Sequence, residues 1–150
     1  MVEIRQTSIA EIVSSASYEA MISAYAAESA IVGVPECKPN INTYLAMESA
    51  GLLHCFGAFV DDDLVGMLLM TVSQVPQYGC DMASIVIFYV SDECRKGGTG
   101  KHLIDAAESI ARHRGAVAIL MGAPANGRLA KAAPLMGFKG SHISFSKVLS

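Results

Sequence analysis

One short segment, RKGGTGKH from Arg95 to His102, combines cationic side chains with three glycines. It follows an apolar, β-branched run and precedes a run with helical periodicity, so we expect it where a strand turns into a helix. The first N–H groups of a helix lack internal partners, and the helix dipole favours negative charge there. Gly98 and Gly100 allow a phosphate to approach the backbone and tolerate positive φ. The segment predicts an anion site that fits a diphosphate, with a turn that binds nothing as the alternative.

Two familiar phosphate-binding motifs do not match this segment. The Walker pattern requires a glycine at the position of Arg95 and a Ser or Thr at the position of His102. The dinucleotide fingerprint requires its third glycine where the chain has Leu103. What remains is an Arg-x-x-Gly-x-Gly turn, in which the cations add charge-assisted contacts at the rim. The predicted binding residues of this turn are Arg95, Lys96, Gly97, Gly98, Thr99, Gly100 and Lys101.

The sequence indicates no metal or redox site. No CxxC or Cys/His pairing links the four widely spaced cysteines, Cys37, Cys55, Cys80 and Cys94. The acidic triplet Asp61 to Asp63 lies between two apolar runs, and three successive carboxylates cannot all converge on one ion. We therefore expect a solvated hairpin turn there and no bound metal.

The elements that must position the turn follow from the apolar periodicity. Ser8 and Glu11 have the spacing of a helix capping box, and Gly51 is placed to end a helix. The run at 83–90 is apolar without strict alternation, as expected of a central strand buried on both faces. The order is mixed α/β: strand 2–6, one broken or two short helices over 8–30, helix 41–51, hairpin 52–72, strand 83–90, helix 101–114, strand 116–122, short helix 126–133 and strand 142–149.

Length and composition limit the classes of protein that fit. The 150 residues are expected to form one domain, 1–150. The net charge of −3 argues against a broad nucleic-acid-binding surface. Hydrophobic residues make up 52% of the chain, yet no apolar run approaches the roughly 20 residues of a membrane helix. The first residues do not resemble a secretory signal, so we expect a cytoplasmic protein with neither nucleic-acid nor membrane partners.

The Arg-x-x-Gly-x-Gly turn and its surroundings resemble the GNAT superfamily of acyl-CoA-dependent N-acetyltransferases. Val90 lies five residues before Arg95, as in the family's lead-in, although Asp92 replaces the usual Pro. The hairpin VDDDLVG at 60–66 and the interval of eleven residues between Asn126 and the Gly-Phe pair at 137 also match. The matches extend over about residues 2–148. The resemblance implies a GNAT-like acyl-CoA N-acyltransferase fold, with a mixed central sheet of six to seven strands and about four helices.

The resemblance also implies where acetyl-CoA binds. Backbone groups of Phe88, Tyr89 and Val90 are expected to pair with the pantetheine amides, and the backbone N–H of Val90 to stabilise an oxyanion. The glycine turn is expected to wrap the pyrophosphate. Asn126 is expected near the pantetheine or thiol end. Tyr25, Tyr44 and Met47 either shape the acceptor pocket or belong to the core.

The groups that move protons depart from the family pattern. Many members carry a Glu base on the central strand, but 83–90 contains no carboxylate, and the position of the usual Tyr acid is Ala133. Substitutes for the base are Asp81, His54 and Tyr89, with Asp81 as the candidate catalytic residue. Two hypotheses follow. One is an N-acetyltransferase for a primary amine of a small molecule or polypeptide, compatible with a homodimer. The other is a non-catalytic acyl-CoA-binding sensor or partner module.

Overall fold

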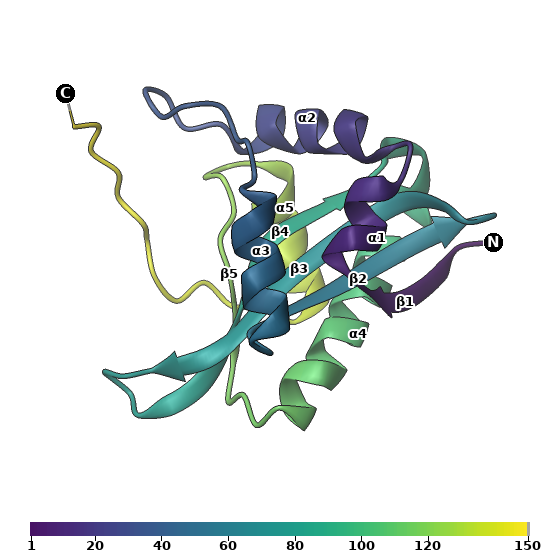
Figure 1. The fold of residues 1–150 in the computed structure, drawn as a ribbon. Coiled ribbons are helices and arrows are strands. Elements are labelled where there is room, and N and C mark those ends of the chain that lie inside the picture. The colour runs from purple at the N-terminus through teal and green to yellow at the C-terminus, as the bar shows by residue number, and fades with distance from the viewer. Residues whose placement is uncertain (150) are drawn as a thin grey trace.

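The computed structural model describes residues 1–149 and contains a five-stranded mixed sheet in the order β1-β2-β3-β4-β5 (Figure 1). The first four strands pair antiparallel, and β4 pairs with β5 in parallel. The expected mixed α/β architecture is confirmed. The strands are β1 (Glu3–Thr7), β2 (Leu53–Val60), β3 (Asp63–Val75), β4 (Cys80–Val90) and β5 (Ile119–Met121).

Helices cover both faces of the sheet (Figure 1). One face carries α1 (Ile9–Ser14), α2 (Tyr18–Ser29) and α3 (Ile41–Ser49), and the other carries α4 (Thr99–His113). A short α5 (Arg128–Ala132) continues into the 3-10 turn η2 (Ala133–Met136). Two helices begin at side-chain caps: Ser8 accepts a hydrogen bond from the Glu11 N–H, and Asn40 accepts one from the Thr43 N–H.

The β2–β3 hairpin places its turn at Asp61 and Asp62, while Asp63 already belongs to β3. Asp61 has φ +49° and Asp62 has φ +67°. Two successive residues with positive φ are typical of the type I′ turn, whose twist matches that of the flanking strands. The first two residues of the acidic triplet therefore form the predicted hairpin turn, and the third begins β3.

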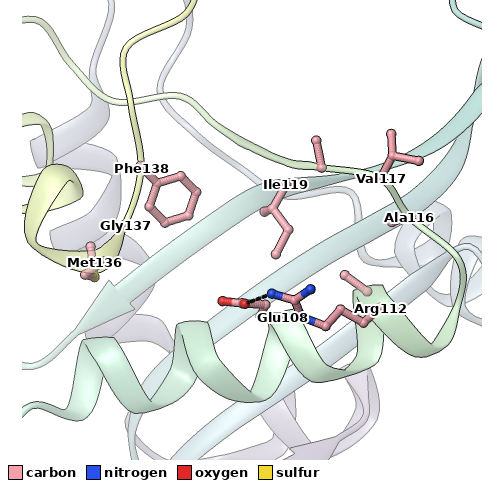
Figure 2. Close-up of a pocket in the computed structure, with 10 residues that line it drawn as sticks. Glu108, Arg112, Ala116, Val117, Ile119, Met136, Gly137 and Phe138 are labelled. Atoms are coloured by element: carbon pink, nitrogen blue, oxygen red, sulfur yellow. Dashed lines mark hydrogen bonds and ion pairs between the residues drawn. The ribbon is translucent and has the colours of Figure 1, made fainter.

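The outer edge of the sheet differs from the sequence prediction. Only three residues of 116–122 form β5, and the predicted strand 142–149 has no regular secondary structure. The sheet described here thus has five strands instead of six to seven. A strand requires a neighbour to complete its hydrogen bonds, and 142–149 runs away from β5 (Figure 1). Beside β5 the structure leaves a cavity of about 240 Å³, whose wall includes Ile119 and Phe138 (Figure 2).

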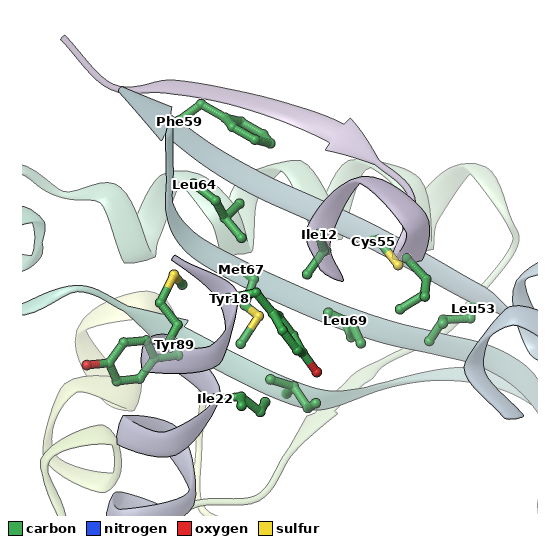
Figure 3. Close-up of a cluster of buried hydrophobic side chains, with 13 residues drawn as sticks. Ile12, Tyr18, Ile22, Leu53, Cys55, Phe59, Leu64, Met67, Leu69 and Tyr89 are labelled. Carbon is green, nitrogen blue, oxygen red and sulfur yellow. The ribbon is translucent and has the colours of Figure 1, made fainter. Parts of the chain in front are cut away.

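Alternation along the strands divides the core into two apolar clusters. Cys55, Leu64, Met67 and Leu69 pack beneath α1, α2 and α3, together with Tyr18 of α2 (Figure 3). The cluster on the opposite face packs beneath α4 and includes Phe56, Leu68, Met70, Leu103 and Ile104. Because side chains point alternately to the two faces, neighbouring residues of β2 and β3 serve different clusters.

Candidate functional site

The carboxyl end of β4 leads through a 3-10 turn, η1 (Asp92–Gly97), into α4. Gly98 joins the two elements with φ +79°, a left-handed conformation that favours glycine. The first helical bond of α4 runs from the His102 N–H to the Gly98 carbonyl, over 3.0 Å. The N–H groups of the residues between them therefore lack acceptors within the helix. The predicted helix N-terminus with outward N–H groups is formed at this place.

One cavity of about 460 Å³ collects most of the residues predicted to bind the cofactor. It lies between the end of β4, the glycine turn, α5 and η2, and its exposed lining is mainly apolar. Eight predicted residues line it: Phe88, Tyr89, Val90, Arg95, Lys96, Gly98, Gly100 and Lys101. The cavity joins a helix N-terminus, where negative charge is favoured, to a mainly apolar wall, a combination that suits a ligand with a charged end and a long uncharged arm.

Three predicted residues do not line this cavity. Thr99 is buried at the start of α4, with 2% of its surface exposed. Gly97 ends η1 at the surface, and Asn126 is exposed, with φ +61° in the turn before α5. Asn126 therefore lies within the turn that leads to the cavity wall, while Asn126 itself does not line the cavity.

The residues that form the far wall of the cavity were not predicted from the sequence. Arg128, Leu129, Ala132, Leu135 and Met136 line the cavity from α5 and η2. Leu129, Ala132 and Met136 recur at spacings of three and four, the pattern of an apolar helical stripe. This stripe is the signal from which the wall could have been predicted.

Strand β4 separates from β5 beside this cavity. Their last pair is Ile85 with Met121, and β4 continues to Val90 without a further partner on that side among the described residues. A β-bulge occurs at the same point, because Leu69 pairs with Ile87 while Met70 pairs with Ile85. The bulge leaves Val86 unpaired with β3 at the fork between the two strands.

The register of β3 and β4 shows which backbone groups face the gap. The Ser91 N–H donates to the Val65 carbonyl over 2.8 Å, so Val90 and Gly66 form a non-hydrogen-bonded pair. The backbone N–H and carbonyl of Val90 therefore point away from β3. Phe88 lies two residues earlier and shares this orientation. The backbone of both residues is thus directed into the separation between β4 and β5.

The Arg95 side chain is held by contacts within the protein. Its Nε donates to the Val90 carbonyl over 2.6 Å, and its Nη2 donates to Glu28 Oε1 of α2 over 3.0 Å. Nη1 lies 3.1 Å from Asp92 Oδ1, and the guanidinium carbon lies 5.0 Å from the centre of the Tyr89 ring. Only 15% of the side chain is exposed. Arg95 therefore braces the end of β4 against α2 and η1.

The other cations of the turn have separate surroundings. Lys96 is exposed and lines the cavity, and Lys101 forms an ion pair with Asp105 one turn along α4. Asp92, which stands where the resembled family has Pro, also lies 3.4 Å from Arg128 of α5. Arg95 and Lys101 are thus engaged with carboxylates, and Lys96 is the exposed cation that we expect to be available for an anionic ligand.

Of the three candidates for a base, only Tyr89 lines the cavity. Asp81 is exposed at the opposite end of β4, and nine strand residues from Val90 correspond to about 30 Å. His54 is buried on β2 near Ile110 of α4 and Arg114, which follows that helix, and burial lowers the pKa of His54. Burial raises the pKa of Tyr89, which opposes its ionisation near neutral pH. The structure does not bring Asp81 or His54 to the cavity.

Tyr25 of α2 contacts β4 next to the point where β4 and β5 separate. Its hydroxyl donates to the carbonyl of Val86, the bulged residue, over 3.3 Å, and burial raises its pKa. Tyr25, Tyr44 and Met47 are all partly buried against the apolar cluster of this face. Tyr25 thus connects α2 directly to the point where β4 and β5 separate.

Comparison with known proteins gives the family. A profile of the acetyltransferase (GNAT) family matches residues 18–138, most of the chain. The chain belongs to the GNAT acetyltransferase family. No curated protein sequence matches this acetyltransferase significantly. Membership implies an acyl-CoA cosubstrate, and the glycine turn and apolar channel fit one.

Solved structures with this fold are similar over almost the whole acetyltransferase. A ribosomal-protein-alanine N-acetyltransferase from Brucella melitensis biovar Abortus 2308 has a TM-score of 0.70 at 20% identity, with 98% of each chain covered. An aminoglycoside acetyltransferase from an uncultured soil metagenomic sample, in complex with sisomicin, has a TM-score of 0.76 at 16% identity, covering 99% of this chain and 97% of that one. Glucosamine-6-phosphate N-acetyltransferase from Arabidopsis thaliana has a TM-score of 0.72 at 10% identity, covering 98% and 97%. These identities support the shared fold alone.

Among residues 1–149, no helix has both the length and the apolar character needed to cross a membrane. The same residues hold no group of three His, Cys, Asp or Glu side chains arranged for a metal ion. Burial, with the nearby Glu48 carboxylate, raises the pKa of the Cys55 thiol to about 12.

Proposed function

We propose that this protein transfers the acetyl group of acetyl-CoA to a primary amine of a small molecule or polypeptide by direct attack of the amine. The observation that carries the proposal is the single cavity that joins the α4 N-terminus to the gap beside β4. Acetyl-CoA supplies an activated thioester when bound. The protein contributes binding and orientation, which can lower a barrier substantially when the reacting atoms are held together.

Different parts of the cavity bind the pyrophosphate and the pantetheine arm of the cofactor in this proposal. The free N–H groups at the start of α4 and the exposed Lys96 hold the pyrophosphate, and Gly100 leaves room for it. A Cβ at Gly100 would lie 3.3 Å from Phe88 Cζ, so a larger residue would crowd the strand as well as the ligand. Backbone groups of Phe88 and Val90 face the gap, where they can pair with amides of the pantetheine arm.

The Val90 N–H is the proposed oxyanion donor. The strand register directs it away from β3, and the Arg95 Nε holds the carbonyl of the same residue. A donor fixed in this way stabilises charge without reorganising during the reaction. Side-chain proton transfer is not part of the proposal: Ala133 occupies the family's acid position and Asp81 lies at the other end of β4. Water in the open cavity takes the amine proton.

The acceptor is proposed at the level of its chemical class. The structural neighbours include proteins described as acting on aminoglycosides, on a ribosomal-protein alanine and on glucosamine 6-phosphate. All three descriptions fit acetylation of an amine, while the molecules that carry the amine differ widely. A primary amine is therefore the shared feature that we carry over.

The test is acetyl-CoA binding followed by release of free CoA. At a hundredfold excess over its dissociation constant, acetyl-CoA should stabilise the fold by about 2.7 kcal/mol and raise the thermal midpoint. CoA release is then measured with an aminoglycoside, an amino-sugar phosphate and a peptide with N-terminal alanine. An unchanged midpoint at millimolar acetyl-CoA would overturn the proposal.

The second candidate is a non-catalytic acyl-CoA-binding module. Its support is that β4 contains no carboxylate beside the cavity and that Ala133 replaces the acid. The same experiment separates the two functions. A raised midpoint without CoA release on any amine favours the module, and amine-dependent CoA release favours the enzyme.

A further inference from the structure

A second groove lies at the end of α4 that is opposite to the glycine turn. It has a volume of about 570 Å³ and is lined by Gln6 of β1, His54 of β2, Ile110 and His113 of α4, and Arg114. The 15 residues of α4 span about 22 Å along the helix axis. No residue lines both this groove and the cofactor cavity, so the two are separate places on the molecule.

The lining of the groove is rich in hydrogen-bond donors. The amide of Gln6, the imidazoles of His54 and His113 and the guanidinium of Arg114 can all donate. The lining contains no Asp or Glu. An anion in the groove would therefore meet several donors and no lining carboxylate that competes with it.

Arg114 differs from the other arginines of the chain. Arg5, Arg95, Arg112 and Arg128 each form an ion pair with at least one carboxylate. Among residues 1–149, no carboxylate forms an ion pair with Arg114. This is notable in a chain whose net charge is −3, where carboxylates outnumber cations. Arg114 thus brings to the groove a positive charge that no carboxylate of the described chain neutralises.

The end of α4 does not require the Arg114 side chain as a cap. A cationic side chain near a helix C-terminus often bonds the last carbonyls. Here the backbone bonds them instead: the Gly115 N–H donates to the Arg112 carbonyl and the Ala116 N–H to the Ala111 carbonyl, each over 3.0 Å. Gly115 has φ +82°, and together these features form a Schellman motif. The guanidinium of Arg114 therefore remains available to a ligand.

His54 adds a buried imidazole to the same cluster. Only 5% of the residue is exposed, and its Nε2 has no hydrogen-bond partner among the described residues. Nearly all buried polar atoms in proteins have a partner, so an exception calls for an explanation such as a bound water or ion. Burial and then the charge of Arg114 lower the pKa of His54. The ring thus lies in a positive environment that a bound anion would offset.

We propose that this groove binds the anionic group, phosphate or carboxylate, of a small molecule. Arg114 is the main electrostatic contact, and Gln6, His54 and His113 supply further donors. Hydrogen bonds from a guanidinium to an oxyanion are among the strong ones in proteins. The volume of the groove falls in the range of small-molecule sites. Because the groove and the cofactor cavity share no residue, both can be occupied at once.

The test follows the imidazole NMR signals of the four histidines while inorganic phosphate is added at constant pH and ionic strength. His54 and His113 report on the groove, His102 reports on the start of α4, and His142 reports on the C-terminal segment. We expect the signals of His54 and His113 to shift and to reach saturation. A parallel titration with acetate distinguishes the two anions: the anion that saturates these signals is the group that the site accepts.

Two matched variants locate the contact. Arg114→Gln should weaken phosphate binding by at least about tenfold, because it removes the charged partner of the anion. Arg112→Gln removes the same charge two positions earlier, where the partner is Glu108, and should bind phosphate as the unaltered chain does. Both arginines are exposed, so the variants are expected to fold, and thermal midpoints check this.

Three results would overturn the proposal. They are a phosphate response confined to His102, a response of His54 and His113 that grows without saturation for both anions, and equal phosphate affinities of the two variants. None of these measurements uses acetyl-CoA. A chain that failed to bind acetyl-CoA would overturn the proposed function and leave the anion site standing.

Discussion

The cofactor side and the α2–α3 side of β4 are built in different ways. On the cofactor side, seven consecutive residues from Arg95 to Lys101 supply the turn and the helix N-terminus. On the α2–α3 side, the surface is assembled from separate helices and strands, with Tyr25 meeting Val86 across 61 positions of the chain. The first arrangement relies on backbone groups and the second on side chains. In the proposed function, backbone groups hold the shared cofactor, and we expect side chains of the α2–α3 side to distinguish the acceptor.

The sharpest test of the cofactor side is to replace its glycines. Gly98→Val forces a branched residue into φ +79°, and Gly100→Val places a Cβ 3.3 Å from Phe88. Each change should weaken acetyl-CoA binding about a hundredfold, or about 2.7 kcal/mol, measured by isothermal titration. Asp62→Ala in the distant hairpin turn is the control and should bind normally. Wild-type affinity in both glycine variants would show that the phosphates bind elsewhere.

The link between the two sides is tested at Arg95. Arg95→Leu leaves the Val90 carbonyl without its donor and separates the turn from Glu28. We expect a loss of about 2 kcal/mol in the free energy of unfolding, mostly from the unsatisfied carbonyl, since the carboxylate partners are largely exposed. Lys96→Leu removes the neighbouring exposed cation and should change stability little. Equal unfolding midpoints in urea for the two variants would contradict the bracing role of Arg95.

The apolar cluster beneath α2 and α3 contains Cys55, whose raised pKa should make the free energy of unfolding depend on pH. The folded pKa of Cys55, about 12, lies above the usual thiol value of 9.0, so its contribution is complete below pH 9 and is lost as pH rises towards 12. In that window the free energy of unfolding should fall by up to about 1.4 kcal/mol per pH unit on account of this thiol. Cys55→Ala should make the profile shallower by this amount. Parallel profiles for the two proteins, from urea unfolding at each pH, would exclude the thiol as the cause.

The smallest effect is expected at Tyr89, between the two sides. A general acid contributes about 10²- to 10⁴-fold to a rate, and its ionisation produces an alkaline limb in kcat. If catalysis relies on positioning, kcat should reach a plateau at high pH with the best amine, and Tyr89→Phe should leave kcat nearly unchanged. An alkaline limb that disappears in Tyr89→Phe would instead identify Tyr89 as the acid.

The C-terminal segment shows where prediction from sequence fails. Residues 142–149 have the alternation of a strand, and the structure gives them none, because a strand is completed only by its neighbour. The resemblance to the family had implied six to seven strands, and the structure contains five. The predicted helices and the hairpin were found, since caps, apolar periodicity and turn residues act within a few residues of one another.

By itself, the sequence determined the local structure around the glycine turn. It predicted a strand over the apolar run 83–90, a glycine suited to the left-handed conformation at position 98, and a helix N-terminus directly after it. These features depend on backbone preferences of consecutive residues. Only the tertiary structure decided that Arg95 pairs with Glu28, that α5 closes the cavity, and that β4 bulges at Val86 where β5 ends. Each of these depends on residues that are distant in the chain. Their positions follow from how the layers pack and how the strands register, and no local pattern encodes that outcome.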